Sequence, residues 1–176
     1  MYKRQHEADQ RLPVGLDLGA DLDQGRPEPL VLAGATAGGE LARRVRDANR
    51  EDERFGPPLV EICAEIEADR ETLIGLMDRL GIRRDPVKPA AAWAVEKLGR
   101  LKLNGQLTGY SPLSRQVELE GLLIGIAGKE QMWRALGHTL GPKLGEVDFV
   151  QLAERAERQR TVVAGLHLEA ASLALR

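Results

Sequence analysis

The chain has 176 residues, of which 43% are hydrophobic, 30% are charged and 3% are aromatic, and its formal net charge is −2. This length suits one domain and is too short for two full ones, and the small net charge excludes a general attraction to nucleic acid or to an anionic membrane. The single cysteine, Cys63, excludes an internal disulfide, and the absence of a signal-peptide pattern or a membrane-spanning apolar run predicts a cytoplasmic protein.

Residues 1–29 carry scattered glycines and prolines with no sustained hydrophobic period, which is typical of an irregular or disordered leader. The first five residues, Met1 to Gln5, also resemble peptides translated from sequencing-adapter read-through in metagenomic genes. A non-native origin is therefore one hypothesis for part of this leader. We expect the folded domain to occupy residues 30–176.

The first helix is predicted from Leu30 to about Asn49. Its apolar and small residues recur at steps of three and four, as one face of a helix requires. They are Leu30, Gly34, Ala37, Leu41, Val45 and Ala48.

The second helix is predicted from Pro57 to Leu80, because proline is favoured in the first turn and Gly81 stops the pattern. Its apolar row keeps a heptad spacing in which Asp69 is the one polar member. The row consists of Leu59, Ile62, Ile66, Asp69, Leu73, Leu76 and Leu80.

A long connection is predicted between the second and third helices. Pro86 and Pro89 open a shorter helix that closes at Asn104 and Gly105. The whole connection has about thirty residues, whereas adjacent bundle helices are usually joined by about two to eight. A connector of this length can run along the bundle and make the second and third helices parallel.

The third helix is predicted from Pro112 to about Leu140 with Ser111 as its N-cap, and the fourth begins after Gly145 with Asp148 as its N-cap. The sequence therefore predicts an all-α, four-helix bundle with a long helical crossover between helices 2 and 3. The apolar row of the fourth helix consists of Leu152, Ala156, Gln159, Val163, Leu166, Ala170 and Leu173.

Several segments of the chain carry a family resemblance. They are Ala33 to Thr36, Glu40 to Arg44, Ala64 to Glu67 with Asp69 and Arg70, Ala94 to Gly105, Thr108 to Ser114 and Val117 to Gly121. On these segments, about four fifths of the chain resembles an uncharacterised bacterial family of ferritin-like helical proteins that is frequent in actinobacteria. The resemblance implies a ferritin-like bundle and assigns no activity. Upstream the chain departs from the family, because Pro27 to Val31 replace an Asn-Asp-His-Leu run, which leaves the start of the first helix open.

A ferritin-like fold raises the question of a di-iron site, which needs inward glutamates and Glu-x-x-His pairs. The sequence has no Glu-x-x-His pair. The remaining candidate ligands for iron or manganese are Glu40, Asp69, Glu120 and His167. For Asp69 we favour an ion pair or hydrogen bond that sets helix register, because a carboxylate at a core position needs a partner. For His167 we favour an ordinary hydrogen bond.

Three glycines, Gly121, Gly125 and Gly128, lie on one side of the third helix. Each costs a helix about 1 kcal/mol relative to alanine, so a compensating role is expected. We favour close helix packing, and a ligand cavity in the bundle core is the alternative. Cys63 flanks the apolar row of the second helix and is interpreted as a small apolar filler.

The connection is also a basic, amphipathic segment. We favour its docking on an acidic face of the second helix, formed by Glu61, Glu65, Glu67, Asp69 and Glu71, within one chain or across a dimer. Association with an anionic membrane surface is the alternative. The candidate surface residues are Arg83, Arg84, Lys88, Trp93, Lys97, Arg100 and Lys102.

The sequence shows no Gly-rich phosphate loop, catalytic triad or zinc spacing, and we name no catalytic residue. It favours a non-catalytic ferritin-like bundle that binds a ligand or acts as a scaffold, as a homodimer with no nucleic-acid partner. One alternative is a degenerate di-metal carboxylate protein in iron handling or oxidative stress. The other is membrane-surface association through the basic crossover.

Overall fold

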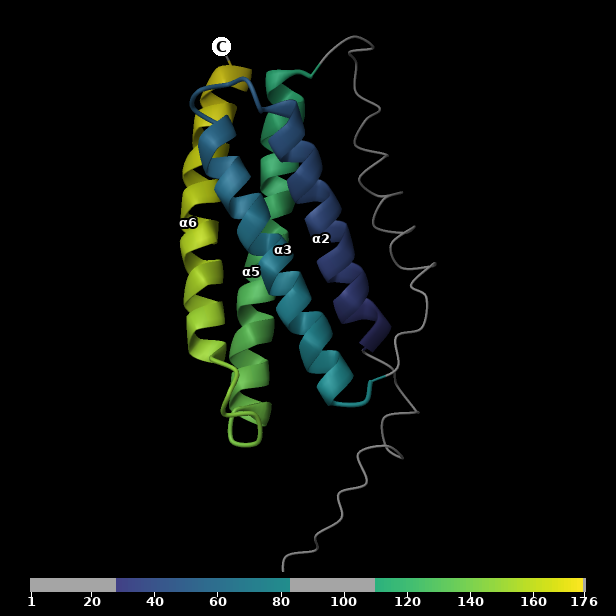
Figure 1. Ribbon diagram of the computed structural model, residues 1–176. Coiled ribbons are helices and arrows are strands. Elements are labelled where there is room, and N and C mark those ends of the chain that lie inside the picture. Colours follow the sequence, from purple (N-terminus) through teal and green to yellow (C-terminus); the bar gives the residue numbers. More distant parts are fainter. Residues whose placement is uncertain (1–27, 83–109, 176) are drawn as a thin grey trace, which may run out of the picture.

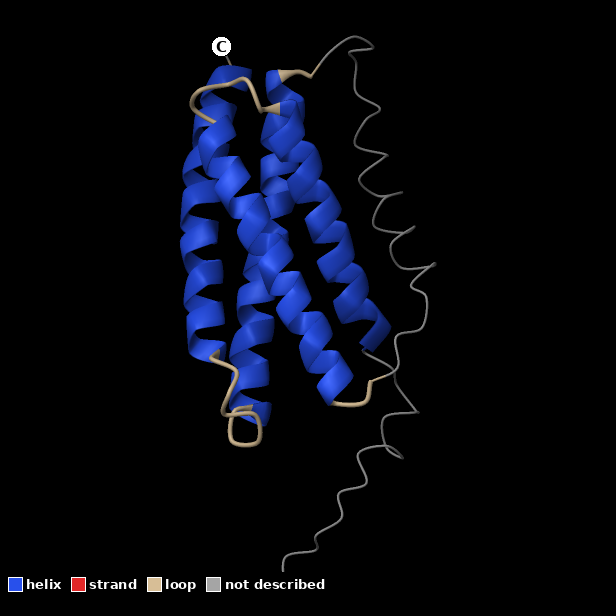
Figure 2. Cartoon of the chain, in the orientation of Figure 1, coloured by secondary structure: helices blue, strands red, loops and turns tan. Residues whose placement is uncertain are grey.

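The computed structural model describes residues 28–82 and 110–175, which form four helices and no strand (Figure 1, Figure 2). The helices pack against one another, so the predicted all-α, four-helix architecture is confirmed for this part of the chain. None of these helices combines the length and apolar character needed to cross a membrane. They are α2 (Glu28–Ala48), α3 (Gly56–Arg79), α5 (Pro112–Leu140) and α6 (Phe149–Ala174).

The four helices form two antiparallel hairpins, α2 with α3 and α5 with α6 (Figure 1). The helix α3 ends at the opposite end of the bundle from the end where α5 begins, so α3 and α5 run in the same direction. This is the parallel arrangement that the long connection predicts. The predicted crossover helix itself falls in residues 83–109, and most of the predicted leader falls in residues 1–27, both outside the described residues.

The helix ends lie where local sequence signals predict them. The Ser111 hydroxyl accepts a hydrogen bond from the backbone N–H of Ser114 at 3.1 Å, and the Asp148 carboxylate accepts one from Gln151 at 2.9 Å. Gly81 has a φ of 67°, in the left-handed region that glycine enters without strain. Because each N-cap is worth about 1 kcal/mol, these ends are specified by their own residues. Only α2 differs, beginning at Glu28.

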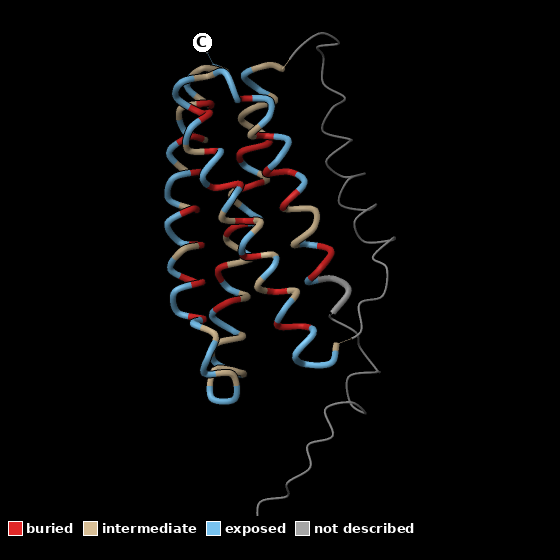
Figure 3. The backbone as a smooth tube through the Cα atoms, in the orientation of Figure 1, coloured by how far each residue is buried: buried red, intermediate tan, exposed pale blue. Residues whose placement is uncertain are grey.

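Each helix turns one buried face toward a shared core (Figure 3). The predicted row of α3 is buried as far as Leu76, and Leu80 is exposed after the helix end. The predicted face of α2 is wrong in part, because Gly34 and Ala48 are exposed and Leu32 is buried instead. Glycine and alanine contribute little hydrophobic area, so the larger side chains set the rotation of this helix.

Candidate functional site

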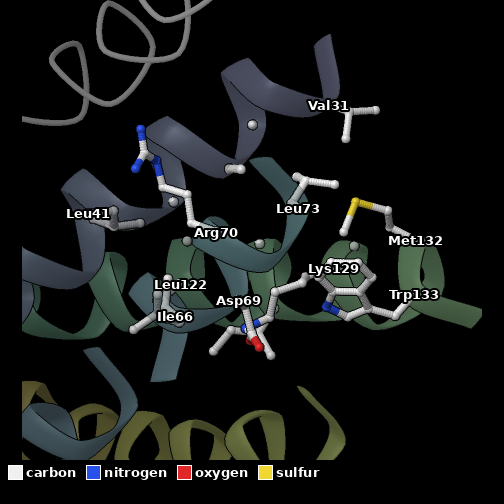
Figure 4. Close-up of a pocket in the computed structure, with 17 residues that line it drawn as sticks. Val31, Leu41, Ile66, Asp69, Arg70, Leu73, Leu122, Lys129, Met132 and Trp133 are labelled. Atoms are coloured by element: carbon white, nitrogen blue, oxygen red, sulfur yellow. The ribbon is translucent and has the colours of Figure 1, made fainter. Parts of the chain in front are cut away.

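A pocket of about 310 Å³ opens between α2, α3 and α5. Its volume falls at the lower end of the range of small-molecule sites, which is about 300–1,000 Å³. Most of its lining is apolar, and Leu41, Leu73 and Met132 lie around it (Figure 4). Such a lining would bind an apolar molecule by removing its surface from water.

Glycines border this pocket where a bundle would ordinarily carry larger side chains. Gly34 and Gly38 of α2 and Gly125 and Gly128 of α5 all line it. A Cβ atom built on any of these four would meet no atom within 4 Å. The favoured prediction of close helix packing is therefore wrong for Gly125 and Gly128, which are exposed and border the open side of the pocket. Gly121 also lines the pocket.

The glycine of α5 that does mark a close helix contact is Gly137. A Cβ at this position would lie 2.9 Å from the Cβ of Phe149, the first residue of α6. Next to it, the rings of Trp133 and Phe149 have centroids 6.4 Å apart. Close packing of α5 and α6 thus depends on a glycine near their connecting loop.

Asp69 lies at the floor of the pocket with two cationic partners. Its side chain is 2% exposed, Lys129 Nζ lies 2.5 Å from Asp69 Oδ2, and the Arg155 guanidinium donates to the other carboxylate oxygen. Removing one member of such a buried group would leave uncompensated charge, so the pairing constrains α3, α5 and α6 together. Asp69 thus forms an ion pair, which is one of the two interactions favoured for it from the sequence.

The buried polar network continues from Lys129. Its ammonium group also donates to Gln159 Oε1 at 2.6 Å, and Gln159 Nε2 donates to Glu65 Oε2 at 2.7 Å. Burial lowers the pKa of Lys129, although the nearby Asp69 carboxylate opposes that shift. Gln159, a polar member of the predicted α6 row, is thereby satisfied.

Lys129 and Trp133 are site residues that the sequence analysis missed. Trp133 is fully buried and lines the pocket, and its Nε1 has no hydrogen-bond partner among the described residues. The signal was present in α5, because Leu122, Ile126, Lys129 and Trp133 follow one another at steps of four, three and four. A lysine on an apolar row indicates a buried cation, by the reasoning that selected Asp69.

The other predicted metal ligands differ from Asp69 in burial and in their partners. Glu40 and Glu120 are exposed, and His167 is half-buried with no hydrogen-bond partner for Nε2 among the described residues. In residues 28–82 and 110–175, no three His, Cys, Asp or Glu side chains gather in a way that could hold a metal ion. Binding of iron or manganese stays a prediction from residue types.

The acidic face predicted on α3 is engaged mainly within the bundle. Glu65 bonds to Gln159 as described above, and Glu67 pairs with Arg43 at 2.6 Å. Glu71 pairs with its neighbour Arg70 at 3.0 Å. The basic residues predicted to dock on this face, from Arg83 to Lys102, lie outside the described residues.

Cys63 is buried, as its predicted role of apolar filler requires. Burial raises the pKa of its thiol, and the Arg46 guanidinium beside it only partly opposes that shift. A thiol with a raised pKa carries little thiolate at neutral pH, so it is a poor nucleophile.

A second polar cluster joins the start of α3 to the start of α5. Asn49 donates to the Tyr110 hydroxyl at 3.1 Å, and the Arg115 guanidinium lies over the Phe55 ring, 4.2 Å from its centroid. Arg115 also pairs with Asp52 at 3.3 Å. Because these contacts use the available charges for packing, we assign this cluster to stability.

Tyr110 should make the protein less stable in alkali. Burial raises the pKa of its hydroxyl to about 12 from an ordinary value of 10.0. The folded state therefore favours the neutral phenol, and this stabilisation is present below pH 10 and is lost as the pH rises toward 12. Between pH 9 and 11.5 the free energy of unfolding, measured with urea, should decline less in Tyr110→Phe than in the unaltered chain. The difference should be up to about 1 kcal/mol after solvent screening. The unaltered chain is the reference, and an equal decline in Tyr110→Phe and in the unaltered chain would refute this assignment.

Comparison with protein-family models, curated proteins and solved structures gives no match for this chain. The features that bear on function are the pocket and its polar floor, which Asp69 and Lys129 form.

Proposed function

We propose that the protein is a non-catalytic, ferritin-like bundle that binds a small and mainly apolar molecule in the pocket between α2, α3 and α5. The observation that carries this proposal is the open space in front of Gly34, Gly38, Gly125 and Gly128. Each glycine costs its helix about 1 kcal/mol relative to alanine, and no packed neighbour offsets that cost. A bound molecule would supply the missing contacts.

The polar floor favours binding over catalysis. Asp69 is held by two cations, and Lys129 is held by Asp69 and Gln159. A general base or a nucleophile needs a lone pair that faces the substrate, and these groups are already engaged with each other. The parallel direction of α3 and α5 supports the ferritin-like part of the proposal.

Binding of naphthalene, followed by isothermal titration calorimetry, tests this function. A dry cavity of about 150 Å³ can bind benzene, so a pocket about twice as large should accept two fused rings. Gly125→Leu places a side chain in the pocket and should weaken binding by about tenfold or more, equivalent to about 1.4 kcal/mol.

Gly165→Leu is the matched control for this experiment. Gly165 lies on α6, is exposed, has no atom within 4 Å of an added Cβ, and does not line the pocket. The Gly165→Leu substitution should leave the affinity for naphthalene unchanged. No binding by the unaltered chain, or equal loss in both variants, would rule out the pocket as the binding site.

The proposal includes a homodimer. Exposed apolar side chains on α5 and α6 support it, because an interface between two copies would remove their surface from water. Ile124 and Leu168 are each 67% exposed, and Val150 is 69% exposed. Light scattering on a size-exclusion column should give twice the 19.3 kDa mass of one chain. A mass of one chain at micromolar concentration would contradict this part of the proposal.

A further inference from the structure

Two side chains at the pocket, Trp133 and Lys129, supply hydrogen-bond donors for a ligand. The indole nitrogen of the fully buried Trp133 has no partner among the described residues. Figure 4 shows this nitrogen on the edge of the ring that faces Lys129. An ammonium group has three N–H donors, and those of Lys129 reach two acceptors within residues 28–82 and 110–175, Asp69 and Gln159. A buried donor without an acceptor is costly, so an acceptor from a ligand would be favoured here.

The charges around this floor decide which kind of acceptor fits. Arg70 also lines the pocket, and its positive charge is paired with Glu71 at 3.0 Å. At the floor, Asp69 and Glu65 each contribute one negative charge, and Lys129 and Arg155 each contribute one positive charge. These charges balance in a largely buried cluster. A ligand carboxylate would add an uncompensated charge at low dielectric, whereas an uncharged oxygen would not.

We infer that the ligand carries an uncharged carbonyl oxygen at one end of its apolar body, and that this oxygen accepts hydrogen bonds from the Trp133 indole N–H and the Lys129 ammonium. The inference rests on the proposed function, because it places the polar end of the ligand in the same pocket. Met132 lines the pocket next to Trp133 and is unbranched, so its side chain can move to admit the oxygen.

Three probes of similar shape test this inference by calorimetry: naphthalene, 2-acetylnaphthalene and 2-naphthoate. The ketone should bind about tenfold more tightly than naphthalene, because it satisfies buried donors. The carboxylate should bind more weakly than the ketone, because it brings a charge into a balanced cluster. Tighter binding of 2-naphthoate would overturn the choice of an uncharged acceptor.

The indole N–H resonance of Trp133 supplies an independent readout on the unaltered chain. The chain has two tryptophans, so Trp93→Phe assigns the two indole signals. The ketone should move the Trp133 N–H signal downfield and slow its exchange with solvent, and naphthalene should do neither. An unchanged Trp133 signal with bound ketone would refute the hydrogen bond.

Trp133→Phe keeps an aromatic ring and removes the N–H donor. With folding checked by circular dichroism, both probes are titrated against this variant, and the ratio of its two affinities should no longer show the tenfold preference for the ketone. If naphthalene binds and the ketone has no advantage in the unaltered chain, the inference fails and the proposed function stands. If neither probe binds, both the inference and the proposed function fail.

Discussion

Replacing Asp69 with asparagine is expected to lower the free energy of unfolding by about 3–5 kcal/mol, the range for breaking a buried ion pair by removing one partner. Asparagine keeps the shape of the side chain and removes its charge. Lys129, whose side chain is 15% exposed, then remains charged in an apolar setting, and Arg155 loses its carboxylate partner. Urea unfolding at pH 7, followed by circular dichroism, measures the loss.

The pH dependence of this loss separates a charge effect from a packing effect. Burial lowers the pKa of Lys129 even with Asp69 present, and the variant removes the carboxylate that opposes this shift. A lysine with a lowered folded pKa destabilises the fold while it is charged, and stability recovers as the pH rises above that folded pKa. The difference between Asp69→Asn and the unaltered chain should therefore narrow between pH 7 and pH 10.

Glu71→Gln on the same helix is the control for Asp69→Asn. Glu71 is 68% exposed, and among the described residues it pairs with its neighbour Arg70, so its removal should change stability by less than about 0.5 kcal/mol. A loss below about 1 kcal/mol for Asp69→Asn, or a loss that does not change with pH, would show that the buried pair is not a main constraint on the bundle.

Alanine at Gly137 and alanine at Gly125 should change stability in opposite directions. At Gly137 the new methyl group would lie 2.9 Å from the Cβ of Phe149, an atom that cannot move without the α6 backbone. This overpacking should cost about 1–3 kcal/mol. At Gly125 the methyl group meets no atom within 4 Å, and the better helix propensity of alanine should add up to about 1 kcal/mol.

The paired substitutions distinguish a packing glycine from a pocket glycine on one helix. Both change the same residue type to the same residue type within α5, so their effects on the unfolded chain are similar. Thermal and urea unfolding of the two variants give the comparison. A destabilisation at Gly125 as large as that at Gly137 would mean that α2 and α5 pack closely in solution and that the pocket is closed.

Some glycine and proline positions determine structure through their own backbone, and others do so only through neighbours. Gly81, which follows α3, has a positive φ, and Pro112 is the first residue of α5. The sequence predicted both helix boundaries correctly. Gly125 and Gly137 both lie in the interior of the same helix. Their opposite environments depend on where α2 and α6 lie, which no local pattern specifies.

The sequence by itself determined the four described helices, the N-caps at Ser111 and Asp148, and the core row of α3, because these depend on contacts within a few residues and on helical periodicity. It also singled out Asp69 as a residue that needs a partner. Only the tertiary structure supplied those partners, since Lys129 and Arg155 are 60 and 86 residues away along the chain. The pocket and the donors at its floor likewise exist only where α2, α3 and α5 meet, because a cavity is a property of the space between helices rather than of any one of them.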